Sequence, residues 1–184
     1  MSASAAWLID VGYLVKASKG RFKLDYVEAG RFIKRKCGPT HIYLFNGYDP
    51  THGVEQELQY FYDTMKRHGM QVRLHPMQPD AEGIYRPRRV DVDLSAHLVW
   101  QASIPELQTV VLTTGDQDFV PAVELARREY DKRVILFTYR AMVNRDLVVA
   151  ASERWQFEGE EDQVARKCKG GKHGFAGART RRES

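Results

Sequence analysis

Short apolar segments that alternate with amphipathic ones are the feature that most constrains the fold of this chain. Residues 5–11 (AAWLIDV), 41–45 (HIYLF) and 109–114 (TVVLTT) are apolar runs of strand length. Residues 25–36 and 51–68 instead carry apolar side chains at helical spacing. This order predicts an α/β, three-layer fold, in which a mostly parallel sheet of about five strands has helices on both faces. The ligand site of such a fold lies outside the carboxyl ends of its strands.

The rest of the chain continues the same alternation. Residues 76–89 contain three prolines and a glycine, so we predict a loop there. Asp91 stands where the N-cap of the next helix would lie. The other predicted elements are strands at 71–75, 133–138 and 154–157 and helices at 118–130 and 144–151.

Composition places the chain among ordinary globular proteins. It has 184 residues, of which 43% are hydrophobic and 28% are charged. No apolar run approaches the roughly 20 residues of a membrane span, and the first residues lack the basic region of a signal peptide, so we expect a cytoplasmic protein that does not bind a membrane. Cys37 and Cys168 are far apart and have no CxxC neighbours, which argues against a zinc site or a disulfide.

The positive charge of the chain is concentrated at its end. The net charge is +4, but residues 166–184 alone contribute +6, which leaves −2 for residues 1–165. We therefore expect a domain over residues 1–158 and a basic, disordered tail over residues 159–184. Such a tail could bind nucleic acid electrostatically, or mediate contact with a protein partner or a second copy of the chain.

Aspartates fall where the predicted strands end. Asp10 ends the first strand, Asp116 and Asp118 follow the TVVLTT strand, and Asp91 and Asp93 begin the helix after the long loop. Carboxylates that lie close together repel one another and stay ionised when cations lie between them. Oxygen ligands of this kind favour Mg²⁺ or Mn²⁺. Alternatively, each aspartate caps a helix or forms a turn, which suits Asp91 and Asp118 better than Asp10, which directly follows Leu8 and Ile9.

Three segments together resemble a known family. Leu8-Ile9-Asp10, Val90-Asp91-Val92 and Thr114–Phe119 (TGDQDF) resemble the NYN domain family, in particular its LabA-like branch, over roughly residues 5–157. This family is a PIN-like group of predicted metal-dependent ribonucleases. The resemblance implies a PIN-like, Rossmannoid fold and RNA cleavage with Mg²⁺ or Mn²⁺. It also implies that Thr114 bonds a water or a phosphate, and that the catalytic, metal-binding residues are Asp10, Asp91, Asp116 and Asp118.

Two positions depart from the pattern of that family. Tyr13 replaces an asparagine that often follows the first aspartate by three residues, and His97 replaces an acid six residues after Asp91. Asp93 is an additional acid. Because Asp93 and His97 are four residues apart on a predicted helix, they share a face. They either supply the missing metal ligand together or form an ion pair on the surface.

Candidate RNA contacts surround these acids. Arg86, Arg88 and Arg89 directly precede Asp91, and guanidinium groups bind phosphates in a bidentate manner. Tyr13 and Tyr48 lie near the predicted ligand edge, where aromatic rings can stack on unpaired bases. The alternatives are a solvated arginine loop and tyrosines that belong to the core.

Three functions are compatible with these residues. The first is a metal-dependent ribonuclease that acts on single-stranded or structured RNA. The second is a non-catalytic module that binds RNA or a protein partner. Tyr13 and His97, which depart from the family's pattern, favour this function. The third is a small-molecule phosphatase that forms an aspartyl-phosphate at Asp10. That chemistry needs a second aspartate two residues later, where the chain has Gly12, so it ranks last.

Overall fold

Six parallel strands form the central sheet. The computed structural model describes residues 4–83, 85–86 and 88–166, with the backbone alone for residues 85, 86 and 88. The strand order is β3-β2-β1-β6-β7-β8, and every neighbouring pair is parallel. The prediction of a mostly parallel α/β sheet is therefore confirmed, and each of the six predicted strand segments forms one of its strands. The strands span Ala5–Asp10 (β1), Thr40–Tyr48 (β2), Gln71–Pro76 (β3), Thr109–Thr113 (β6), Arg133–Thr138 (β7) and Glu153–Gln156 (β8).

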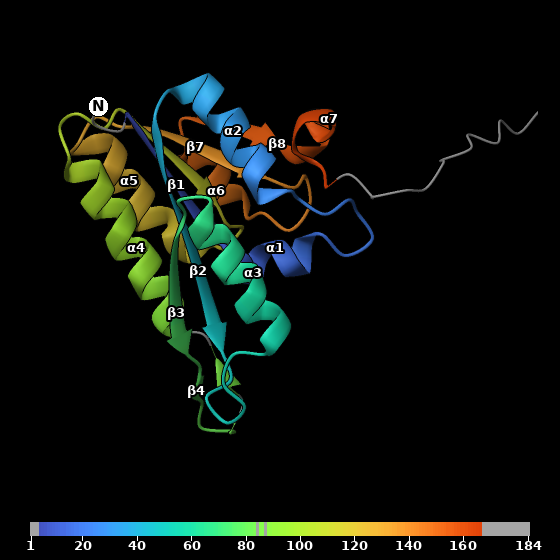
Figure 1. The fold of residues 1–184 in the computed structure, drawn as a ribbon. Helices are drawn as coiled ribbons and strands as arrows, with labels where there is room; N and C mark the ends of the chain where they lie inside the picture. Colours follow the sequence, from blue (N-terminus) through green and yellow to red (C-terminus); the bar gives the residue numbers. More distant parts are fainter. Residues whose placement is uncertain (1–3, 84, 87, 167–184) are drawn as a thin grey trace, which may run out of the picture.

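Helices cover both faces of the sheet, as the sequence predicted. Figure 1 shows α4 and α5 on one side of the sheet and α2 and α3 on the other. One apolar core lies under α4 (Arg88–Ser103), α5 (Val120–Arg128) and α6 (Arg145–Ala150). The other lies under α1 (Val11–Ala17), α2 (Tyr26–Cys37), α3 (Gln56–Arg67) and α7 (Glu161–Val164).

The sequence of β1 explains why it lies at the centre of the sheet. Its five apolar residues are fully buried, and successive side chains point to opposite faces. Trp7 and Ile9 enter the core under α2, whereas Ala6 and Leu8 enter the core under α4. The indole nitrogen of Trp7 donates to the hydroxyl of Thr113 (2.9 Å), so the buried polar group is satisfied.

Four boundaries differ from the sequence prediction. Helix α1 follows β1 directly, in a segment for which the sequence predicted no helix. Helix α3 begins at Gln56 rather than at Thr51. Helix α4 begins at Arg88, so Asp91 lies in its first turn and is not its N-cap. The segment predicted as a loop contains a short antiparallel pair, β4 (Gln78–Pro79) and β5 (Tyr85–Arg86), which lies past the end of β3 in Figure 1.

Folded structure continues past residue 158, where the tail was predicted to begin. A 3₁₀ turn (Phe157–Gly159) and α7 follow β8, and the side chains of Phe157 and Val164 are fully buried. The amide of Asp25 donates to the carbonyl of Val164 (2.8 Å), and that of Arg166 donates to the carbonyl of Lys23 (2.8 Å). Burial of these two apolar side chains explains the later boundary. Residues 167–184 of the predicted tail lie outside the described residues.

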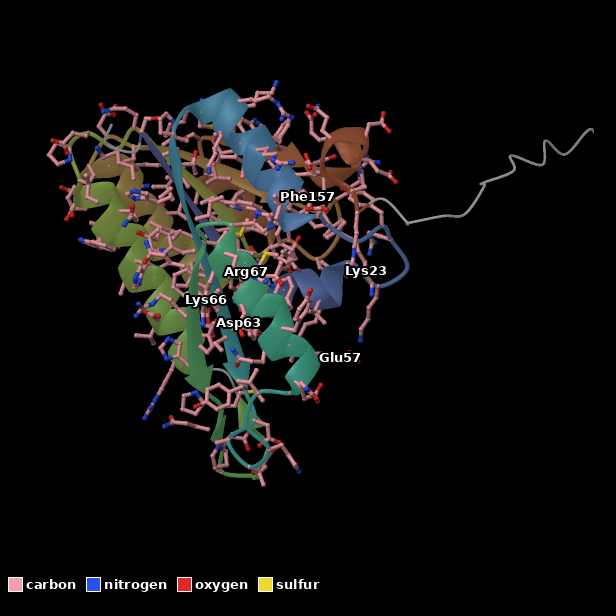
Figure 2. All side chains as sticks on the ribbon, viewed as in Figure 1. Lys23, Glu57, Asp63, Lys66, Arg67 and Phe157 are labelled. Atoms are coloured by element: carbon pink, nitrogen blue, oxygen red, sulfur yellow. The ribbon has the colours of Figure 1, made fainter. Side chains whose placement is uncertain are left out.

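The exposed side of α3 carries charges of both signs. Figure 2 labels Glu57, Asp63, Lys66 and Arg67 along this helix, and Lys66 lies 3.5 Å from Asp63. This is the pattern of a solvated helix face. None of the helices in the described part of the chain is long and apolar enough to cross a membrane.

The extended boundary predicts that two truncations behave differently. A chain that ends at Glu158 loses the buried Val164 side chain, so its free energy of unfolding should be about 2–4 kcal/mol lower than that of the full chain. A chain that ends at Arg166 should match the full chain. Urea unfolding followed by circular dichroism measures both. Equal stability of the two truncated chains would place the end of the folded domain at residue 158.

Candidate functional site

The site lies at the switch point of the sheet, where the order in which the chain adds strands changes direction. From β1 the chain builds β2 and β3 on one side, and it later returns to build β6, β7 and β8 on the other. The neighbours of β1 are therefore β2 and β6, and the connections that leave β1 and β6 diverge. Ligands of open α/β sheets bind at such a switch point, beyond the carboxyl ends of the strands.

Asp10 is the last residue of β1 and the N-cap of α1. Its carboxylate accepts hydrogen bonds from the amide of Tyr13 (2.9 Å) and from the hydroxyl of Thr114 (3.0 Å). Thr114 is itself fully buried. Burial raises the pKa of Asp10 and outweighs these hydrogen bonds, and the nearby charge of Asp116 raises it further. The carboxylate is thus held in place and is costly to leave charged.

Asp116 lies in the turn that follows β6. It caps the 3₁₀ turn Gln117–Phe119, and its carboxylate accepts from the amide of Asp118 (3.0 Å). Asp10 and Asp116 meet at one edge because β1 and β6 pair in parallel, with Ile9 opposite Thr113. Both carboxylates line one pocket of about 750 Å³.

Asp91 reaches the same pocket from the first turn of α4. Burial, followed by the negative charges of Asp10, Asp116 and Asp118, raises its pKa to about 6. Lys16 on α1 opposes this shift. Three of the four predicted acids therefore converge from three different elements and influence one another electrostatically.

The fourth predicted acid lies beside the pocket. Asp118 is exposed in the 3₁₀ turn and is absent from the described lining of the pocket, although it is near enough to raise the pKa of Asp91. It does not cap a helix, because Asp116 caps the 3₁₀ turn and Phe119 is the N-cap residue of α5. Asp118 therefore belongs to the rim of the site.

Asp93 and His97 point away from the pocket. Asp93 lies two residues after Asp91, so the two side chains leave α4 on different sides. The carboxylate of Asp93 contacts Arg73 (2.6 Å), His75 (2.7 Å) and His97 (3.0 Å). Although burial opposes it, hydrogen bonds from Arg73 and His75 hold the pKa of Asp93 below its usual value. Asp93 and His97 thus contact each other away from the pocket, in a half-buried network with Arg73 and His75. A shared role of the pair as metal ligands stays a prediction.

The predicted RNA contacts are only partly near the pocket. Thr114 lines it, but its hydroxyl already donates to Asp10. Tyr13 also lines it, yet the ring is 7% exposed and belongs to the core, so it offers no face for stacking. Tyr48 is half-buried at the end of β2 and is not part of the described lining.

The three arginines lie near the N-terminus of α4. Arg89 is exposed in the first turn of α4, next to Gln78 of β4. The backbones of Arg86 and Arg88 belong to β5 and α4, and their side chains lie outside the described part of the chain. Their contact with phosphates stays a prediction.

Four polar residues of the pocket were not predicted from the sequence. Asn46 lies on β2, Gln117 and Asn144 follow β6 and β7, and Lys16 lies on α1. The amide of Asn144 donates to that of Gln117 (3.0 Å). The rule of strand carboxyl ends would have identified Asn46 and Asn144, had it been applied to amides as well as acids. Lys16 lies four residues after Gly12 and so on the same face of α1. This spacing indicates a pocket residue only when the segment is known to be a helix.

A known family matches most of the chain. The family model described as "NYN domain" matches residues 4–156.

The chain belongs to the NYN domain family.

A crystal structure of a Vibrio parahaemolyticus protein of unknown function has the same fold as this NYN domain. The two chains share 19% sequence identity with a TM-score of 0.68, over 89% of this chain and 99% of the other. At that identity, the likeness concerns the fold alone. No curated protein matches the sequence.

The donor atoms of the NYN domain suit a hard divalent cation. Asp10, Asp91 and Asp116 present carboxylate oxygens, which Mg²⁺ and Mn²⁺ prefer, and their mutual repulsion is what a cation would relieve. Within the described ranges, however, no three acids, histidines or cysteines are gathered closely enough to form a complete metal site. The donor atoms of these residues are therefore of the type that such an ion prefers, but the fold does not bring three of them to coordinating distance.

Gly115 is required by the close approach of another segment. A Cβ atom at this position would lie 1.9 Å from the carbonyl oxygen of Met142 and 2.8 Å from the ring of Tyr13. The carbonyl of Gly115 also accepts from the amide of Asn144 (2.9 Å). The loop that contains Met142 and Asn144 is thus packed directly on the turn that carries Asp116.

This contact makes Gly115→Ala a sensitive substitution. Because the clash is with backbone, we expect a loss of at least about 2 kcal/mol in the free energy of unfolding. Gly159→Ala is the matched control, since its Cβ would meet nothing within 4 Å. Thermal denaturation measures both. Similar melting temperatures for the two variants would contradict the packing described here.

The raised pKa of Asp91 predicts how stability depends on pH. Asp91 binds its proton more tightly in the folded chain than in the unfolded chain, where its pKa is near 3.8. Without divalent metal, the contribution of Asp91 therefore declines as pH rises from about 4 to about 6 and is constant above that range. Asp91→Asn should remove this decline and, after allowance for solvent screening, stabilise the metal-free domain at pH 7 by about 1 kcal/mol.

Urea unfolding in the presence of EDTA across pH 4–8 tests this expectation. Asp63→Asn on the exposed face of α3 is the control, and it should leave the pH profile unchanged. A lower stability of Asp91→Asn at pH 7 would show that the carboxylates do not repel one another as the geometry indicates.

Proposed function

We propose that this NYN domain is a divalent-metal-dependent ribonuclease that hydrolyses RNA phosphodiester bonds. The observation that supports the proposal most strongly is the convergence of Asp10, Asp91 and Asp116 on one pocket at the switch point of the sheet. Each comes from a different element, and each is partly buried or lies near another acid. Family membership supports the same reading, and the TGDQDF segment favours the LabA-like branch.

In this proposal Asp10, Asp91 and Asp116 hold Mg²⁺ or Mn²⁺, with Asp118 at the rim. Such a cation stabilises negative charge on a phosphodiester and lowers the pKa of water. Thr114 and the amide of Tyr13 act as positioning groups, because they fix both oxygens of Asp10. Lys16 lines the pocket and could contact a non-bridging oxygen of the phosphate.

The amides of the pocket would contact the rest of the nucleotide. Asn144 and Gln117 are hydrogen-bonded to each other, which fixes their orientation at the rim. Asn46 is held in the same way, because it donates to the hydroxyl of Tyr62 (2.6 Å). Side chains that are held rigidly lose little entropy when they bind a substrate.

A second function is favoured by one specific observation. Because the described residues do not form a complete metal site, the domain could bind RNA without cleaving it. In that case affinity would fall steeply with salt, but purified protein would not turn over. A role for residues 167–184 in contact with a protein partner or a second copy stays a prediction.

An RNA cleavage assay with Mg²⁺ or Mn²⁺ tests the first function. A catalytic cation contributes several kcal/mol of transition-state stabilisation, so Asp10→Asn and Asp116→Asn should each lower the rate by at least about a hundredfold. Asp93→Asn should affect the rate far less, because Asp93 faces Arg73 and His75 rather than the pocket.

Two controls make the result decisive. Asp63→Asn, an exposed acid on α3, should cleave as well as wild type, and EDTA should abolish all activity. Equal rates for wild type, Asp10→Asn and Asp116→Asn would disprove the assignment of the site. Binding of RNA without cleavage by any variant would favour the second function.

A further inference from the structure

A second groove lies beside α1, next to the acidic pocket. It has a volume of about 430 Å³ and is formed by the end of α1, the segment 18–24, Tyr26, Tyr139 and Arg166. Helix α1 contributes to both hollows, since Gly12, Tyr13 and Lys16 line the pocket while Leu14 and Val15 line the groove. Pocket and groove are therefore neighbours along a single short helix.

The groove is closed on one side by the last described residues. Leu24 pairs with Ala165, and the amide of Arg166 donates to the carbonyl of Lys23. Figure 1 shows the loop after α1 close to α7, and Figure 2 labels Lys23 in this region. Arg166 is thereby fixed beside residues that are far away in the sequence.

The charged residues that line the groove are all basic. They are Lys19, Arg21, Lys23 and Arg166, and no acid is among the described lining residues. Arg21 is engaged, because it donates to the carbonyl of Ala17 (2.9 Å) and lies 3.9 Å from Glu158. The side chains of the other three form no hydrogen bond or ion pair with the described part of the chain. Three exposed cations thus remain available to a ligand.

Another groove of the domain, which is lined by cations and by acids, lacks available cations. It lies between α5 and α6, and its cations already have partners within the fold. Arg128 pairs with Glu124 (2.9 Å), Arg133 pairs with Glu153, and Lys132 donates to the carbonyl of Ile104 (3.0 Å). Available cations therefore distinguish the groove beside α1 from an ordinary charged surface.

The floor of the groove beside α1 is apolar. Leu14 and Leu24 lie within the core, and Val15 is 60% exposed. A phosphate on a basic rim and a flat apolar group on the floor are the two halves of a nucleotide. The amide of Lys19 donates to the carbonyl of Lys16 (3.3 Å), so one turn of backbone connects the rim of this groove to the mouth of the acidic pocket.

We propose that the groove beside α1 is a nucleotide-binding subsite for single-stranded RNA. Lys19, Lys23 and Arg166 bind a backbone phosphate next to the one in the acidic pocket, and the attached base lies against Val15. The inference takes RNA as substrate from the proposed function, but it concerns binding and does not require cleavage. It also explains how a domain whose residues 1–166 carry a net charge of −1 (−2 for residues 1–165 and +1 for Arg166) can attract a polyanion.

Fluorescence anisotropy with the full chain in EDTA tests the subsite without turnover. The probe is a labelled, single-stranded oligouridylate of about twelve nucleotides. Lys19→Gln/Lys23→Gln should weaken binding about tenfold and should reduce the slope of log K against log salt by up to about 0.7, the value for one phosphate contact on a single strand. The matched control is Lys34→Gln/Lys36→Gln at the far end of α2, which should change affinity less than about twofold.

Two further probes separate a nucleotide from any other anion. A strand of equal length without bases should bind wild type several-fold more weakly, because the apolar floor would lose its partner. An oligoglutamate of equal charge should bind more weakly still, with little difference between wild type and Lys19→Gln/Lys23→Gln. Equal binding of uridylate and abasic strand, or equal sensitivity of oligoglutamate to the substitutions, would overturn the proposal.

The outcomes also separate this inference from the proposed function. Loss of binding in Lys19→Gln/Lys23→Gln supports the subsite even if wild type never cleaves RNA. Equal loss in the test and control variants overturns the subsite even if Asp10→Asn abolishes cleavage. Melting temperatures within about 2 °C of wild type for both double variants, as surface substitutions normally give, confirm that binding and not folding has changed.

Discussion

The parallel pairing of β1 with β6 is the constraint on which the site depends. With Ile9 opposite Thr113, the residues that follow each strand emerge side by side, so Asp10 and Thr114 come within 3.0 Å although 104 residues separate them. The pairing is fixed by burial, since a shift by one residue would turn Trp7 and Ile9 into the opposite core. The bond from Trp7 to Thr113 satisfies the indole only in the observed register. Packing of the core thus determines the geometry of the acids.

Those parts of the site that follow directly from a strand end could be predicted from the sequence. Asp10 and Asp116 needed only the strand positions and the rule for parallel sheets. Asp91 was identified as well, but its position in the first turn of α4 was not, because the loop before it contains no clear helix start. Lys16 was missed because α1 has seven residues and adjoins β1, too short a segment to show a helical period. Pairing between distant segments, such as Leu24 with Ala165, leaves no local signal in the sequence.

Helix geometry explains why only one of the two acids at the start of α4 belongs to the pocket. Successive residues of a helix turn by about 100°, so Asp91 and Asp93 leave the axis about 200° apart. Once Asp91 points into the pocket, Asp93 must point toward the sheet edge, where Arg73 and His75 of β3 provide partners. Asp93 and His97, which contact each other, therefore lie outside the described lining of the pocket. This leaves Asp10, Asp91 and Asp116 as its acids, with Asp118 at the rim.

The charges of this domain are distributed unevenly, and its small net charge does not show this. The acidic pocket and the basic groove beside α1 have opposite signs and lie within one turn of backbone of each other. The interaction between exposed charges falls off over about 8 Å at physiological salt, so the charges that line each hollow act most strongly on the group that touches them. A bound cation would reduce the negative charge of the pocket, and the neighbouring cations would then attract the phosphates on either side of it. Under these conditions the acidic pocket can accept one phosphate of a polyanion while the groove beside α1 binds the next.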